Sequence, residues 1–155
     1  MKSKLQVLVS TVDAQVEKIA SRMNLETDAI IVNQCDRDAV FEYIYNDKLI
    51  KCYLMTERGV GLSRNTALMH SDHEYCLFSD EDIVFDPGYE QTVCNAFQKN
   101  PDADLITFNF KVHPERKTYY NQENKRIRWY NYGRYPTFAV AARTESLRRA
   151  NVSFS

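Results

Sequence analysis

Short apolar runs separated by polar segments recur along the sequence. Leu5–Thr11 and Ala29–Val32 are β-branched and almost wholly apolar, as is typical of strands covered on both faces. Leu49–Met55 alternates in part, which favours a less central position in the sheet. The pattern as a whole predicts strands over residues 5–11, 29–32, 49–55, 75–78, 104–110 and 137–143. Residues 33–48 give no clear pattern.

Between these runs, apolar residues return at helical spacing. The first such segment predicts a helix over residues 12–23, with Thr11 or Asp13 as N-cap and Asn24 as its end. Gly59–Gly61 predicts a tight turn into a short helix, Leu62–Met69. Further helices are predicted after Pro87-Gly88, ending at Asn100-Pro101, and from Thr144 onward.

Strands and helices therefore alternate with short connections, which indicates an α/β fold with a mostly parallel central sheet flanked by helices. With 155 residues, 44% of them hydrophobic and 12% aromatic, the chain fits one domain over residues 1–155. The formal net charge of −1 provides no positive field for nucleic acid. No apolar stretch approaches a membrane span or a signal peptide, so we expect a cytoplasmic protein.

The four cysteines do not indicate a zinc site or a redox motif. Cys35, Cys52, Cys76 and Cys94 form no Cys-x-x-Cys pair, and three of the four lie in apolar runs. We expect reduced thiols packed in the core.

The segment 113–136 differs from the rest of the chain. It contains five of the ten tyrosines, the single tryptophan and six Lys or Arg residues, but two acidic residues. We interpret it as a long functional loop. A lid over an acceptor, core packing and an oligomer contact all remain open for it.

Ligands of open α/β sheets gather at the carboxyl ends of the strands. Polar side chains that follow the predicted strands are the candidates for such a site: Ser10, Thr11, Asn33, Gln34, Ser63, Arg64, Asp80 and Asp82. Because they come from separate strands, we expect them to face one crevice.

Asp80 and Asp82 are the most informative pair. Residues two apart in an extended chain point to the same side, so both carboxylates could share one ligand. Two neighbouring carboxylates at the end of a buried strand are costly unless a cation or a sugar hydroxyl meets them. Mg²⁺ or Mn²⁺ prefers oxygen ligands and completes its shell with phosphates and water, which indicates a nucleoside diphosphate as partner. An acidic surface loop or a helix cap is the alternative.

Other motifs point to no further site. Gly59-x-Gly61 lacks the third glycine of a dinucleotide fingerprint, and there is no Walker loop. His70 and His73 lack a third metal ligand, so we interpret them as structural.

The order of these parts resembles nucleotide-sugar glycosyltransferases of family 2, which have the Rossmann-like GT-A fold. The resemblance covers nearly the whole chain and rests on Ser10-Thr11, the strand ending Asn33-Gln34, Gly61-Leu62-Ser63-Arg64-Asn65, Phe78-Ser79-Asp80-Glu81-Asp82 and Pro87-Gly88-Tyr89.

The resemblance implies a role for each candidate. Thr11, Asn33 and Gln34 would frame the nucleobase, Arg64 would approach the nucleotide, and Asp80 with Asp82 would hold ribose and the metal-bound diphosphate. Family members often have two aspartates where Asn33-Gln34 stand here. Their general base usually follows the helix that begins at Thr144, so this chain looks truncated and its catalytic base is unassigned.

The implied reaction moves a sugar from a UDP- or GDP-sugar to a glycan or lipid-linked acceptor hydroxyl, with Mn²⁺ or Mg²⁺ and with inversion, in polysaccharide or glycan synthesis. Peripheral association with the inner face of the membrane and oligomer formation stay open. A nucleotidyltransferase is one alternative, although Val12-Asp13-Ala14-Gln15 is unlike its glycine-rich basic loop. A non-catalytic module that binds a glycan or nucleotide is the other.

Overall fold

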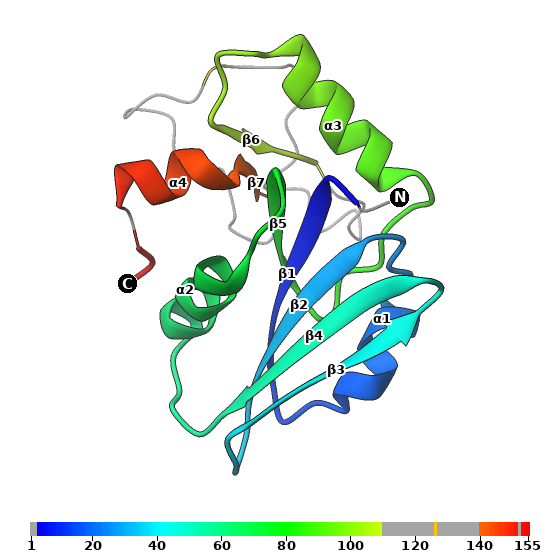
Figure 1. Cartoon of the computed structure of the whole chain (residues 1–155), viewed down its shortest axis with the longest axis vertical. Helices are drawn as coiled ribbons and strands as arrows, with labels where there is room; N and C mark the ends of the chain where they lie inside the picture. The colour runs from blue at the N-terminus through cyan, green and yellow to red at the C-terminus, as the bar shows by residue number, and fades with distance from the viewer. Residues whose placement is uncertain (1–2, 110–125, 127–139, 152) are drawn as a thin grey trace, which may run out of the picture.

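A computed structural model describes residues 3–109, 126, 140–151 and 153–155. Within these residues the chain forms one mixed seven-stranded sheet between two layers of helices, as Figure 1 shows. The strands are β1 (Leu5–Val12), β2 (Asp28–Gln34), β3 (Ala39–Tyr45), β4 (Lys48–Met55), β5 (Tyr75–Asp80), β6 (Leu105–Thr107) and β7 (Val140–Arg143). The helices are η1 (Val16–Lys18), α1 (Ile19–Arg22), α2 (Val60–His70), α3 (Tyr89–Lys99) and α4 (Thr144–Ala150).

The strand order is β3-β4-β2-β1-β5-β7-β6. The four central strands β4, β2, β1 and β5 are parallel, whereas β3, β7 and β6 each join through antiparallel pairs. The α/β architecture is therefore confirmed, and the predicted parallel arrangement describes the centre of the sheet. All four parallel strands end at the same edge, which is where polar residues from different strands meet.

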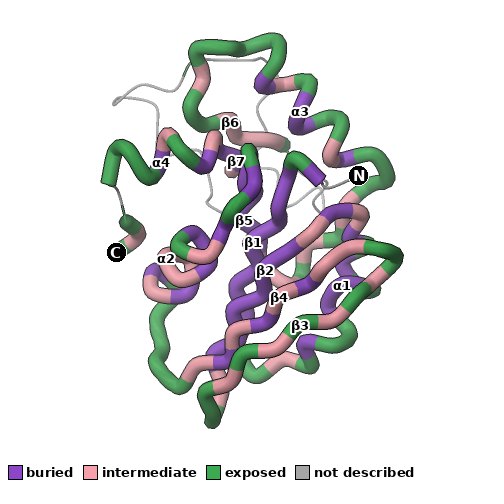
Figure 2. Tube along the Cα trace, viewed as in Figure 1, coloured by how far each residue is buried: buried purple, intermediate pink, exposed green. Residues whose placement is uncertain are grey.

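Each face of the sheet has its own apolar core. Leu5, Val7 and Val9 of β1 face α1 and α3, while Leu8 faces α2 and α4. The alternation of side chains along a strand explains this division, because successive residues point to opposite faces. Figure 2 shows the buried residues concentrated in the central strands. Both sides of the centre are thus covered, as the mostly apolar runs predicted.

Two sequence predictions for the first half of the chain are wrong in detail. Residues 33–48, which gave no pattern, contain the edge strand β3 and a hairpin whose turn residues Asn46 and Asp47 both have positive φ (47° and 64°). The predicted first helix is shorter, because β1 continues in register with β2 as far as the pair Val12 and Gln34. Thr11 is therefore a strand residue and not an N-cap.

The later helices agree with the sequence, whereas the strand predicted over residues 104–110 is shorter, since β6 covers only Leu105–Thr107. Gly59, at φ 139°, turns the chain into α2, and Asn100 follows the last residue of α3. Cys52, Cys76 and Cys94 are buried and all four cysteines are free thiols, as expected. Burial raises the pKa of the Cys52 thiol to about 12. These thiols are packing groups.

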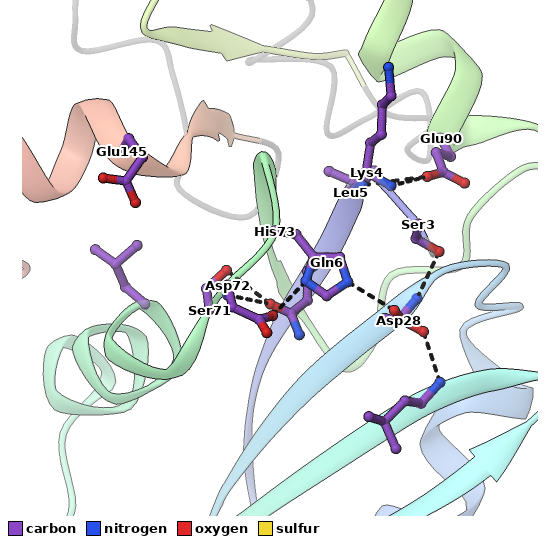
Figure 3. Close-up of polar contacts among 12 residues, drawn as sticks. Ser3, Lys4, Leu5, Gln6, Asp28, Ser71, Asp72, His73, Glu90 and Glu145 are labelled. Atoms are coloured by element: carbon purple, nitrogen blue, oxygen red, sulfur yellow. Dashed lines mark hydrogen bonds and ion pairs between the residues drawn. The ribbon is translucent and has the colours of Figure 1, made fainter. Parts of the chain in front are cut away.

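A polar network joins the amino ends of the central strands, at the edge opposite to the strand carboxyl ends (Figure 3). His73 lies between two carboxylates: Nε2 is 2.8 Å from Oδ2 of Asp28 and Nδ1 is 2.7 Å from Oδ1 of Asp72. The other Asp28 oxygen accepts the N–H of Leu49, and Gln6 Oε1 accepts the hydroxyl of Ser71. His73 thus serves the fold, as interpreted from the sequence.

The structure bears only in part on the predictions for the Tyr-rich loop and for membrane-spanning segments. The Tyr-rich loop, residues 113–136, lies outside the described residues apart from Arg126. Among the described residues, no helix is both long and apolar enough to cross a bilayer.

Candidate functional site

A hollow of about 340 Å³ lies at the carboxyl ends of β1, β2 and β5. It is bounded on one side by the start of α2 and on another by the acidic turn after β5. Its lining residues are Ser10, Thr11, Val12, Gln34, Val60, Ser63, Asp80, Glu81 and Asp82. Strand register explains the convergence, since Ser10 pairs with Asp80 and Val12 pairs with Gln34. We refer to this hollow as the strand-end crevice.

Two residues that line the crevice carry buried hydroxyls. Oγ1 of Thr11 and Oγ of Ser63 find no hydrogen-bond partner within the described part of the chain. Thr11 is 5% exposed and Ser63 1% exposed, so bulk water does not easily satisfy them. A buried polar group without a partner costs stability, so both hydroxyls mark places where the wall of the crevice is under-satisfied.

The two residues that end β2 have different surroundings. Gln34 lines the crevice and its Nε2 donates to the carbonyl of Gly59 at 2.7 Å, which ties β2 to the turn before α2. Asn33 does not line it. The Asn33 amide accepts the N–H of Ala14 at 3.1 Å and donates to the Ala14 carbonyl at 3.2 Å. Asn33 thus shapes the loop after β1, because its side-chain oxygen and nitrogen both bond the backbone of Ala14.

The acidic turn differs from the extended segment that the sequence suggested. Asp80 is the last residue of β5, while Glu81 and Asp82 lie in a turn that the Ile83 N–H closes on the Asp80 carbonyl at 3.3 Å. The argument from strand alternation is therefore wrong for Asp82. The turn nevertheless places both aspartates on the crevice. Glu81, which the sequence did not single out, also lines it and pairs with Arg22 at 3.2 Å.

Arg64 lies beside the crevice and does not line it. Its Nη2 is 3.6 Å from Oδ1 of Asp80, and its side chain is 13% exposed. Burial raises the pKa of the Asp80 carboxyl above its ordinary value of 3.8. The Arg64 guanidinium lowers this pKa, and the carboxylates of Asp82 and Glu81 raise it. The cluster therefore carries excess negative charge that a cation would neutralise.

The donor set fits Mg²⁺ or Mn²⁺ bound together with a phosphate ligand. Within the described residues, no three His, Cys, Asp or Glu side chains gather into a complete metal cage. Mg²⁺ is usually bound through one or two carboxylates, with water and substrate phosphates as the other ligands. Asp80 and Asp82 supply two carboxylates on one hollow, so they suit a shared cation and do not suit a metal held by protein alone.

Replacing Asp80 with asparagine should change how stability depends on pH. Because the pKa of Asp80 is raised in the folded state, the folded protein binds this proton more tightly than the unfolded one, and stability falls as the group ionises. We therefore expect the difference in unfolding free energy between Asp80→Asn and the wild type to shift in favour of the variant as the pH rises from about 4 to the raised pKa. At higher pH this difference should stay constant.

Urea unfolding of the ligand-free protein across this pH range measures the effect. Asp102→Asn, at an exposed site after α3, is the control for the lost charge. A gain for Asp80→Asn that is the same at every pH would contradict the prediction.

A mixed sheet of this order with helices on both faces matches the GT-A fold of nucleotide-sugar glycosyltransferases. The sequence model for glycosyl transferase family 2 matches residues 6–149, and the chain belongs to this family. The resemblance seen in the sequence is confirmed. No curated protein matches the chain in sequence.

Solved structures agree with this fold. S. aureus TarS 1-349 in complex with UDP-GlcNAc superposes with a TM-score of 0.66 at 18% identity, covering 100% of this chain and 49% of TarS 1-349. The same protein in complex with UDP gives 0.64 at 19%, with coverages of 100% and 50%. The mannosyltransferase PcManGT from Pyrobaculum calidifontis, in complex with GDP-Man and Mn²⁺, gives 0.60 at 15%, with coverages of 97% and 47%. The chain spans about half the length of these solved chains.

Proposed function

We propose that the strand-end crevice binds the nucleoside-diphosphate part of a sugar donor together with Mn²⁺ or Mg²⁺. The observation that carries this proposal is the crevice itself, which the carboxylates of Asp80 and Asp82 line together with Thr11, Gln34 and Ser63. A diphosphate that binds with a divalent cation would neutralise these carboxylates. Membership of glycosyl transferase family 2 supports this class of ligand.

We assign different parts of the ligand to different residues of the crevice. Thr11 and Gln34, which line the crevice, would contact the nucleobase, while Asn33 would act through the loop at Ala14. Asp80 and Asp82 would hold the cation, and Arg64 beside Asp80 adds a positive charge toward the diphosphate. When bound, the cation would supply charge neutralisation for a leaving diphosphate. The chain contributes alignment of the donor and exclusion of water.

The reaction served by this site is transfer of a sugar to an acceptor hydroxyl, with inversion, in glycan or polysaccharide synthesis. TarS was solved with UDP-GlcNAc and PcManGT with GDP-Man and Mn²⁺, which supports a nucleotide-sugar donor and a divalent cation here. We also propose that residues 1–155 form one donor-binding domain, since the family match spans nearly the whole chain.

Calorimetric titration of the chain with UDP and with GDP tests this function. We expect one of the two to bind in the presence of Mn²⁺, and at least about tenfold more weakly when EDTA replaces the metal, because carboxylates otherwise repel the diphosphate. Thermal unfolding provides a second measurement, since a ligand of the native state raises the Tm with its occupancy. AMP and free phosphate are the controls. Absence of binding by both diphosphates, with Mn²⁺ present, would contradict the proposal.

A further inference from the structure

Residues 153–155 lie against α2, next to the strand-end crevice. The backbone N–H of Phe154 donates to Oδ1 of Asn65 at 2.7 Å, and the Phe154 carbonyl accepts from Nδ2 of Asn65 at 2.9 Å. One side-chain amide therefore satisfies both polar groups of this residue, in the way a neighbouring strand would. Arg148 adds a link between α4 and the end of α2 by donating to the carbonyl of Ser71.

The ring of Phe154 reaches the residue that approaches the crevice. It packs against Phe78 in a T-shaped arrangement, with centroids 5.0 Å apart, and the Cζ atom of Arg64 lies 5.7 Å from its centroid. The same guanidinium contacts Asp80 at 3.6 Å. Arg64 is thus held by an aromatic ring as well as by a carboxylate, and its side chain is 13% exposed.

Gly61 gives an independent sign of close docking. A Cβ at this position would lie 2.6 Å from the backbone oxygen of Ser155, closer than real Cβ contacts. Gly61 lies inside α2 and its φ is not positive, so the helix does not require glycine there. The missing side chain instead lets the backbone of residues 153–155 approach the helix.

These contacts bear on ligand binding because a long arginine side chain loses rotamer freedom when it binds a phosphate. Contacts that already fix the guanidinium in the free protein reduce this loss. We propose that Phe154 is a positioning residue for the nucleotide site: its ring, placed by the Asn65 clamp, holds Arg64 at the edge of the crevice toward the donor diphosphate. This inference rests on the proposed function.

The leucine variant of Phe154 is the central test. Phe154→Leu keeps apolar contact with Phe78 but removes the aromatic face, and we expect the Kd for UDP or GDP with Mn²⁺ to rise about fivefold. Phe154→Trp should keep the wild-type Kd, because the indole also offers an aromatic face. In an Arg64→Ala background, Phe154→Leu should change the Kd by less than about twofold, since the two residues act as a unit.

Gly61→Ala separates docking from folding. Alanine favours a helix more than glycine does, so α2 should remain folded while residues 153–155 are displaced. We expect a rise in Kd similar to that of Phe154→Leu, with the Tm recorded for every variant. Phe85→Leu is the matched control, because it also removes one ring of a stacked pair, with Tyr89, away from Arg64.

A spectroscopic measurement decides the positioning without any nucleotide. In the free protein, the Arg64 Nε–H resonance should show a ring-current shift that disappears in Phe154→Leu and persists in Phe85→Leu. An unchanged resonance would contradict the contact, whatever the chain binds. If Arg64→Ala weakens binding and Phe154→Leu does not, the positioning role is wrong and the proposed function stands. If neither UDP nor GDP binds the wild type, the proposed function fails, and with it the role of Phe154 in nucleotide binding.

Discussion

Replacing Asp82 with alanine is expected to weaken Mn²⁺-dependent binding of the nucleoside diphosphate about 100-fold, since even outer-shell partners of a metal are worth about 10-fold to 100-fold in affinity. Asp82 is exposed in the turn after β5 and has no role in the apolar cores, so the variant should fold normally. The loss therefore reports on the ligand and not on stability.

The loss of affinity in Asp82→Ala should disappear or reverse in the absence of metal. The crevice lining includes three carboxylates, from Asp80, Glu81 and Asp82, and these repel a diphosphate when no cation is present. In EDTA, Asp82→Ala is expected to bind the nucleoside diphosphate as well as the wild type, or more tightly. This dependence on metal distinguishes a cation ligand from a residue that contacts the nucleotide directly.

Calorimetry with and without Mn²⁺ measures both effects. Asp36→Ala is the matched control, because Asp36 is an exposed aspartate that follows β2 and does not line the crevice. Equal affinities of Asp82→Ala and the wild type in Mn²⁺ would remove Asp82 from the site. A loss that persists unchanged in EDTA would instead assign it to the nucleotide.

Replacing His73 with alanine is expected to lower the free energy of unfolding by about 2–4 kcal/mol, through a cavity and lost charge-assisted hydrogen bonds. The His73 side chain is 4% exposed and lies between Asp28 and Asp72. Its loss would leave Oδ2 of Asp28, whose side chain is 13% exposed, without its imidazole partner. Nucleotide binding should be unchanged, because this network lies at the amino ends of the strands (Figure 3).

Urea unfolding measures the loss, and two further variants separate its causes. His73→Phe fills the space but offers no hydrogen bond, so it should recover only the part due to the cavity. His70→Ala is the matched control, because His70 is half-buried at the end of α2 and stacks on Tyr53 at 4.2 Å. A loss of less than about 1 kcal/mol for His73→Ala would show that water replaces the ring at little cost.

The fold was largely predictable from the sequence where strands are buried on both faces. Leu5–Thr11 is mostly apolar and Tyr75–Phe78 wholly so, and both lie in the parallel centre of the sheet. The edge strand β3 was missed for a physical reason. Val40 and Ile44 are 71% and 65% exposed on its outer face, so apolar residues occur on both faces and the alternation between polar and apolar positions is lost.

The candidate site was predictable in its location more than in its contacts. The rule that ligands meet at strand carboxyl ends brought Thr11, Gln34, Asp80 and Asp82 together, and all four line one crevice. The same rule could not tell that Gln34 lines the crevice whereas Asn33 does not. Both end β2, but the amide of Asn33 is bound to the backbone of Ala14, a pairing set by how the loop after β1 folds back. The roles of all these residues in binding remain predictions.

The sequence by itself determined the α/β class, the family and the edge of the sheet at which a ligand would bind, because these depend on local periodicity and on the order of elements along the chain. The tertiary structure decided which side chains are buried and which groups meet across the fold. Within the described residues, the hydroxyls of Thr11 and Ser63 are buried without a hydrogen-bond partner, and Arg64 lies against Phe154, which is 90 residues further along the chain. Hydrogen-bond satisfaction and burial are properties of the packed neighbourhood, and neither is encoded in any one segment.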